Sequence, residues 1–296
     1  TGPSPKDTPG AGHWRATSTF ISLRGPGSRR ISSRCAQADT VCRVEDDVAS
    51  DTPKGDSGMR AGVPFLRSLL ESPMSGEAIE ALSFATIDRE APLHRFTPAQ
   101  WVVVRRMIHA TADFVLMEDA TFSADAIDAG VAALRMGRPL FVDAGMIRAG
   151  LSLARLREAC PAYGPDSIVC HVADEEVAAQ ARESGLPRSL FAARKAAPIL
   201  DGGIALIGNA PVALLELNRM VIEEGIRPAL VVGMPVGFVH VEESKRELMS
   251  LGVPFISVAG RRGGSPLAVS ALHALCSISV CGSERRRAVP SGGERR

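Results

Sequence analysis

His109 lies in the part of the chain that is best suited to acid–base chemistry. It stands four residues after Arg105 and four before Asp113, so a helix that continues through all three places them on one stripe. Histidine titrates near neutral pH, and a neighbouring arginine or carboxylate can tune its pKa. The pattern indicates a proton donor or acceptor. It also fits a histidine in an ordinary polar network at the edge of a core, which spacing alone favours.

A helix that carries His109 is predicted to begin at Thr97. Thr97 and Gln100 can form a capping box, with Pro98 at the first helical position. Apolar side chains then recur at helical spacing as far as Ile108. His109 therefore falls near the end of a helix whose other face is buried.

The elements around this helix alternate between short apolar runs and helical sequence. Apolar strands separated by helices are typical of a parallel sheet that is covered on both faces. We therefore predict a three-layer α/β/α fold with a mainly parallel sheet of roughly five strands. The predicted strands are residues 140–142, 168–171, 204–207, 230–232 and 254–258.

The segments that follow these strands can bind a ligand, because open α/β sheets bind at the carboxyl ends of their strands. Three of them are glycine-rich and lead into helices: 208–211, 233–237 and 260–265. Exposed backbone N–H groups in such segments favour an anion. The alternative is that the glycines only form tight turns. Neither a P-loop nor a G-x-G-x-x-G motif is present, so a nucleotide is not favoured.

Composition divides the chain into three parts. Residues 1–58 mix Pro, Gly, Ser and Arg without hydrophobic periodicity and are predicted to be a disordered or non-native leader. Residues 59–282 have the pattern of one α/β domain. Residues 283–296 are polar and rich in Arg and Gly, which predicts a disordered tail.

Charge and cysteine usage exclude several classes of protein. Lys and Arg number 34 and Asp and Glu 33, so no net field attracts nucleic acid or an anionic membrane. No apolar run approaches the ~20 residues that span a bilayer, and no signal peptide opens the sequence. The six cysteines suggest neither a metal site nor a disulfide framework. We expect a cytoplasmic enzyme without a bound metal.

Several motifs between Ile79 and about Ala274 occur in a fixed order and spacing. Together they resemble the precorrin-8X methylmutase family, also called precorrin isomerase or cobalt-precorrin-8 methylmutase, of cobalamin biosynthesis. Because the motifs are independent, chance is no serious explanation. They are Ser83-Phe84, residues 106–109, Asp143 with Met146 and Gly150, Arg188-Ser189, residues 207–211 and 233–239, Glu243-Ser244-Lys245, and residues 260–265.

The resemblance implies a homodimeric isomerase without a cofactor. It would move a methyl group from C11 to C12 of precorrin-8X or cobalt-precorrin-8, giving hydrogenobyrinate or its cobalt counterpart. The catalytic residue implied is His109, which would protonate the macrocycle or hydrogen-bond a ring C nitrogen. The substrate carries many carboxylates, which suits the anion-binding loops. The implied substrate-binding residues are Ser83, Arg106, Asp143, Arg188, Ser189, Asn209, Gly237, Gly263, Gly264 and Ser265.

Two positions depart from the family pattern. Val212 and Pro187 stand where the family usually has threonine, and Val212 loses a hydroxyl at a predicted helix start. Both changes are either neutral or weaken substrate contact. The sequence therefore leaves an alternative open, in which the chain is a tetrapyrrole carrier that keeps the fold and the pocket without turnover.

Overall fold

The structure is a computed structural model that describes residues 64–287. The predicted leader, residues 1–58, lies outside the described residues. The predicted tail, 283–296, is described only as far as Arg287. There α13 (Ser265–Arg287) continues five residues into the segment predicted as a tail. Between residues 64 and 287, no helix has both the length and the hydropathy of a membrane span.

The sheet has six strands in the order β1-β6-β5-β4-β2-β3. Each of the five predicted apolar runs contains a strand, and these five pair in parallel. The prediction of roughly five strands missed β1, which pairs antiparallel with β6 at the edge of the sheet. β1 has the sequence Ala-Thr-Phe, with a polar residue at its centre, so it does not stand out as an apolar run as the equally short β2 does. The strands are β1 (Ala120–Phe122), β2 (Leu140–Val142), β3 (Ile168–Val169), β4 (Ile204–Ile207), β5 (Leu230–Gly233) and β6 (Phe255–Val258).

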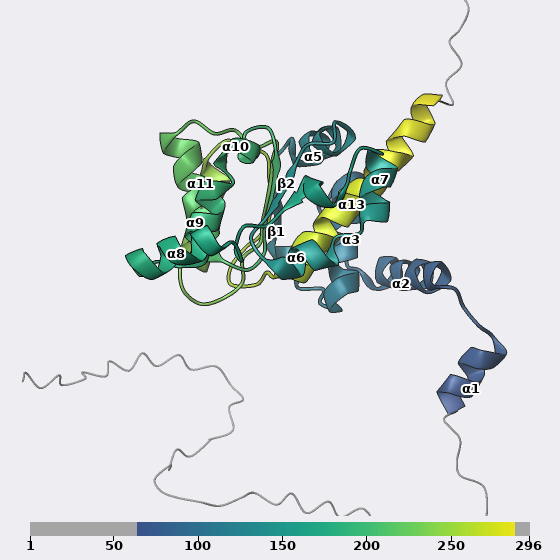
Figure 1. Ribbon diagram of the computed structural model, residues 1–296. Helices are drawn as coiled ribbons and strands as arrows, with labels where there is room; N and C mark the ends of the chain where they lie inside the picture. The colour runs from purple at the N-terminus through teal and green to yellow at the C-terminus, as the bar shows by residue number, and fades with distance from the viewer. Residues whose placement is uncertain (1–63, 288–296) are drawn as a thin grey trace, which may run out of the picture. The chain divides into compact units, whose positions relative to one another are not determined.

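Helices cover both faces of the sheet, as predicted (Figure 1). Successive strand residues point to opposite faces, so Leu206 belongs to one buried cluster and Ala205 to another. The first cluster is covered by α3 (Pro98–Thr111), α5 (Ala126–Arg135), α6 (Gly145–Gly150), α7 (Leu153–Ala159) and α13. The second is covered by α9 (Arg188–Lys195), α10 (Ala197–Leu200), α11 (Pro211–Glu223) and α12 (Val241–Ser250). The remaining helices are α1 (Pro64–Glu71), α2 (Gly76–Glu90), α4 (Leu116–Asp119), η1 (Pro165–Ser167) and α8 (Glu175–Ser184).

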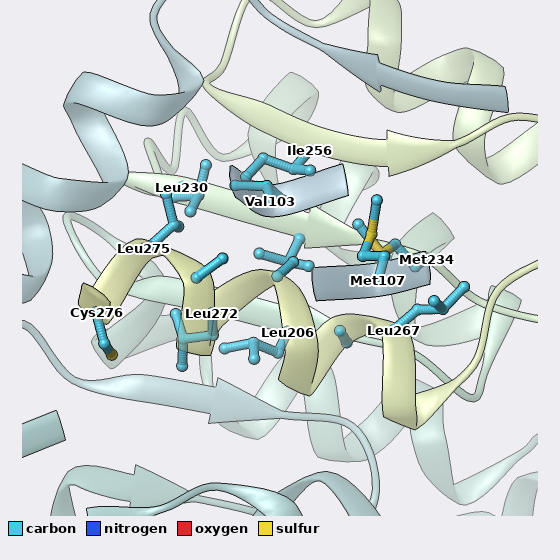
Figure 2. Packing of buried hydrophobic residues seen from close by; sticks show 14 of the residues in the cluster. Val103, Met107, Leu206, Leu230, Met234, Ile256, Leu267, Leu272, Leu275 and Cys276 are labelled. Atoms are coloured by element: carbon cyan, nitrogen blue, oxygen red, sulfur yellow. The ribbon is translucent and has the colours of Figure 1, made fainter. Parts of the chain in front are cut away.

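The packing of α13 against α3 and the sheet fixes the position of the helix that carries His109. Leu272 and Leu275 of α13 lie in one buried cluster with Val103 and Met107 of α3 (Figure 2). All four side chains are fully buried. Burying a side chain of this size contributes about 1.5–3 kcal/mol, so the two helices are held firmly together.

The start of α3 is as predicted, but the helix ends too early to place Asp113 on one stripe with Arg105 and His109. Thr97 Oγ1 accepts a hydrogen bond from the Gln100 N–H at 3.3 Å, and Gln100 Oε1 accepts one from the Thr97 N–H at 3.0 Å, which completes the capping box. The helix ends at Thr111, because Ala112 turns to a left-handed conformation at φ 53°. Asp113 is therefore not on the stripe of His109, and its carboxylate accepts from the Val115 N–H instead.

Candidate active site

His109 is exposed in the last turn of α3, and α2 holds its ring. Its Nδ1 lies 2.7 Å from the Ser83 hydroxyl oxygen. The Phe84 ring meets the imidazole edge-on, with 5.2 Å between the ring centroids. Among residues 64–287, no hydrogen-bond partner lies on Nε2. The ring is therefore oriented by one nitrogen while the other is available to a ligand.

An apolar hollow of about 300 Å³ opens beside the end of α3. Ala110, next to His109, is part of its wall, with Met146 and Gly150 from α6. The hollow's volume is at the low end of the range for ligand pockets. Aliphatic rather than aromatic side chains surround it, as the low aromatic content of the sequence suggested. The rest of its lining comes from the start of α13: Ser265, Pro266, Val269 and Ser270.

Two arginines of α3 form ion pairs with α2. Arg105 binds Asp88 at 2.6 Å, so the expectation that Arg105 tunes His109 is not supported. Arg106 binds Glu80 at 3.1 Å, and Arg155 of α7 shares that carboxylate at 3.3 Å. Burial raises the pKa of Glu80, but the two arginines lower it by more, so the net pKa lies below its ordinary value. The Glu80 carboxylate thus stays ionised, and the cluster carries one excess positive charge.

Phe84 supports these arginines as well as the histidine. The guanidinium carbons of Arg105 and Arg106 lie 4.6 Å and 5.2 Å from the centre of its ring. Stacked cations of this kind contribute about 0.5–1 kcal/mol each when exposed. One half-buried ring therefore contacts His109 and the two charges next to it in the helix.

His273 of α13 lies under the same cluster. Its Nε2 accepts a hydrogen bond from the Ser152 N–H at 3.0 Å. Burial, with the positive charges of Arg155 and Arg106, lowers the pKa of His273 to about 4. The ring is therefore neutral at neutral pH.

Asp143 lies where the strand order reverses, between β2 and β4. Ligands of open α/β sheets bind at such a point. Here the carboxylate is 1% exposed and accepts hydrogen bonds from the N–H groups of Gly208, Asn209 and Ala210, at 3.0, 2.9 and 2.6 Å. Burial raises the pKa of Asp143, and the three N–H groups offset part of that rise. Asp143 was expected to contact the substrate, but its oxygens hold the start of α11 instead.

The two other glycine-rich segments are bonded to each other. The Gly264 N–H donates to the Met234 carbonyl at 2.8 Å, and the Gly237 N–H to the Arg261 carbonyl at 3.4 Å. A Cβ on Gly263 would collide with the carbonyl oxygens of Met234 and Pro235, and Gly264 has a φ of +126°. Glycine is required here for close approach and for backbone conformation. Ser265 follows as the first residue of α13.

Three predicted site residues, Arg188, Ser189 and Asn209, form no hydrogen bond or ion pair with His109 in the described chain. Arg188 and Ser189 begin α9. Asn209 is exposed before α11, and its backbone N–H is used by Asp143. Of the two departures, Val212 is half-buried in the first turn of α11, and Pro187 is exposed at the N-cap of α9.

Lys245 and Glu80 have structural partners that the sequence analysis did not foresee. Lys245 is 1% exposed, although lysine is almost never fully buried unless paired. A signal existed, because it occurs with Val241, Ser244 and Leu248 at the spacing of one buried helix face. Glu80 gave no such signal, since its two arginine partners come from two other helices, α3 and α7.

Comparison with known proteins adds a consistent set of relatives. The family model described as Precorrin-8X methylmutase matches residues 78–278. A cobalt-precorrin-8 methylmutase of Leptospira interrogans is 42% identical over 219 residues, which cover 71% of this chain and 97% of that protein. A precorrin-8X methylmutase of a Sinorhizobium species is 40% identical and covers 68% and 93%. The solved structure of precorrin-8x methyl mutase from Thermus thermophilus aligns with a TM-score of 0.64 at 47% identity and covers 70% of this chain and 98% of that one.

Proposed function

The chain belongs to the precorrin-8X methylmutase family, and we propose on this basis that it moves a methyl group from C11 to C12 of precorrin-8X or cobalt-precorrin-8. The reaction is an isomerisation in cobalamin biosynthesis, so the product has the atoms of the substrate. Nothing in the comparisons favours the alternative of a carrier without turnover. Cobalt, where present, enters as part of the substrate. No group of three or more His, Cys, Asp or Glu side chains in the described chain could hold a metal of its own.

The contact between His109 and Ser83 is the observation that carries the proposal. If the Ser83 hydroxyl donates to Nδ1, the proton of a neutral imidazole resides on Nε2, the nitrogen available to a ligand. That N–H hydrogen-bonds a nitrogen of ring C while the methyl group migrates. A full proton transfer starts instead from the imidazolium, in which Nδ1–H donates to the Ser83 oxygen and the Nε2 proton passes to the ring C nitrogen, leaving a neutral imidazole. The proton returns to His109 afterwards, because no atom is gained or lost. Phe84 keeps the ring in this orientation.

The remaining site residues bind a broad, polyanionic ring. The excess positive charge of the Glu80, Arg106 and Arg155 cluster lies one helical turn from His109 and attracts carboxylates of the substrate. Asp143 has a positioning role, since its carboxylate orients the 208–210 segment. We retain as substrate contacts Ser83, Arg106, Arg188, Ser189, Asn209, Gly237, Gly263, Gly264 and Ser265.

We also propose a homodimer and a cytoplasmic location. Several large apolar side chains are exposed on α2 and in the segment after β5, including Leu82 at 56%, Phe238 at 84% and Val239 at 69%. Such clusters often mark protein interfaces. Light scattering of the purified protein measures the mass of the particle. A monomer at working concentration would contradict the dimer, and recovery in the membrane fraction would contradict the location.

Conversion of the two substrates tests the function directly. Purified protein is incubated with precorrin-8X and, separately, with cobalt-precorrin-8, and the absorption change to hydrogenobyrinate or cobyrinate is followed. We expect turnover of at least one, with the ratio of the two kcat/KM values identifying the natural substrate. Tight binding without conversion of either would instead support the carrier.

A further inference from the structure

A buried lysine lies under the glycine-rich segment at residues 260–265. The Lys245 ammonium donates to the Gly260 carbonyl at 2.9 Å and to the Arg262 carbonyl. Its side chain comes from α12, on the face that also buries Val241 and Leu248. Hydrogen bonds from an ionised donor are about twice as strong as neutral ones. One buried charge therefore holds the backbone of this loop at two points.

The two bonded carbonyls orient two N–H groups. In a planar trans peptide the C=O and the following N–H point in opposite directions, and the described chain contains no cis peptide. The N–H groups of Arg261 and Gly263 therefore point away from Lys245. In the part of the chain that the structure describes, neither has a hydrogen-bond acceptor. An ammonium on the carbonyl oxygen polarises the peptide group and strengthens its N–H as a donor.

Several charged groups lie around Lys245 and its loop. Two carboxylates face the lysine, Asp119 from the end of α4 and Glu242 from α12. Each is also paired with an arginine of the loop, Asp119 with Arg262 at 3.1 Å and Glu242 with Arg261 at 3.2 Å. Arg262 pairs in addition with Asp113 at 3.7 Å, so three carboxylates face the three cations. Lys245 is the one of these cations that is buried, and it bonds the backbone instead of a carboxylate.

We propose that Lys245 is a positioning residue that holds and polarises the 260–265 loop, so that the N–H groups of Arg261 and Gly263 bind a carboxylate of the substrate. This inference rests on the proposed function, because the carboxylates are those of the precorrin ring. Lys245 itself does not touch the substrate. Successive backbone N–H groups of this kind form anion-binding concavities in many proteins.

The proposal has a pH signature. Burial lowers the pKa of Lys245 to about 8, with Asp119 and Glu242 opposing part of that shift. Above that pH the amine becomes neutral, its two hydrogen bonds weaken, and its positive charge under the loop disappears. Affinity for the substrate then falls. A bound carboxylate stabilises the ammonium, so the loss shows in kcat/KM, which reports the free enzyme, more than in kcat.

The test compares the full chain with Lys245→Met, Lys245→Arg and the control Lys195→Met, from about pH 7 to about pH 9. Lys195 is a surface lysine paired with Asp174 and Glu176, so its variant should behave as the wild type does. For Lys245→Met we expect KM for precorrin-8X to rise about tenfold at neutral pH, with kcat within about twofold and no further rise at alkaline pH. Lys245→Arg keeps its positive charge throughout this pH range, so its kcat/KM should not fall at alkaline pH.

The possible outcomes distinguish a failure of the role proposed for Lys245 from a failure of the proposed function. A Lys245→Met variant with the KM and the alkaline limb of the wild type would overturn the role of Lys245. If that variant does not fold, the wild-type profile decides, since a kcat/KM that is flat through about pH 9 contradicts the proposal. Absence of turnover by the wild type at every pH would instead remove the proposed function.

Discussion

The helix side and the loop side of the site are built in opposite ways. On the helix side, exposed or half-buried side chains of α2 and α3 hold each other through direct contacts such as His109 to Ser83. On the loop side, two charged side chains are buried and bond the backbone. Asp143 binds three N–H groups, and Lys245 binds two carbonyls.

In the proposed function the two sides have different tasks: the helix side supplies the proton donor, and the loop side fixes the backbone that binds the substrate. In the proposed function the proton donor must reach the substrate, and His109 is exposed. A binding loop needs a fixed backbone, and a buried charge fixes it because an unpaired partner in the interior is costly. Substitutions on the helix side should therefore change kcat, and those on the loop side should change stability or KM.

The largest effect is expected for His109→Ala. Removal of a general acid lowers kcat by about 10²–10⁴-fold. The dissociation constant for precorrin-8X should change by less than about threefold, because the arginine cluster and the loops remain. Single-turnover absorption and fluorescence quenching measure the two quantities. If the variant kept its turnover, His109 would not be the proton donor, and substitutions on the helix side would no longer be expected to change kcat.

Asp143→Ala should have the largest effect on stability. It leaves three N–H groups, that of the buried Gly208 among them, without their acceptor, and we expect the free energy of unfolding to fall by about 3–5 kcal/mol. Urea denaturation measures this loss. The control is Asp128→Ala, an exposed carboxylate on α5, which should cost less than about 1 kcal/mol. Equal losses in the two variants would show that Asp143 does not anchor the loop.

A smaller effect on kcat is expected for Ser83→Ala. The variant loses one hydrogen bond that orients the imidazole, so kcat should fall about tenfold while the melting temperature changes little. Ser83→Thr keeps the hydroxyl and should recover most of the activity. If Ser83→Ala raised KM alone, Ser83 would bind the substrate without orienting His109.

The smallest effect concerns His273, a partly buried group on the helix side. Its pKa is about 4 in the folded chain against 6.5 unfolded, so its contribution to stability is present above pH 6.5 and is lost as the pH falls toward 4. After discounting for its partial exposure, the loss is about 1–2 kcal/mol. His273→Gln keeps an acceptor without titrating, and chemical denaturation at several pH values should show a flatter profile. If the pH dependence of the free energy of unfolding were the same in this variant, the hydrogen bond from the Ser152 N–H would not require a neutral His273 ring.

The sequence revealed the helix side better than the loop side. A capping box, a histidine and its neighbouring arginines are local features, and α3 begins where they predict. Asp143 appeared to be a ligand because it follows a strand, and only the three-dimensional structure shows that its oxygens are already bonded. The contacts of Lys245, which was part of a family motif, and of Glu80 could not be predicted for the same reason. Their partners lie 15 or more residues away.

The central claim is that the His109 side chain supplies the proton for the methyl shift. Chemical rescue tests it most directly, by measuring the turnover of precorrin-8X by His109→Gly with increasing imidazole. We expect saturable recovery of conversion, because imidazole can occupy the space between Ser83 and Phe84 that the side chain left. No recovery in a folded variant that still binds precorrin-8X, or full activity without imidazole, would contradict it.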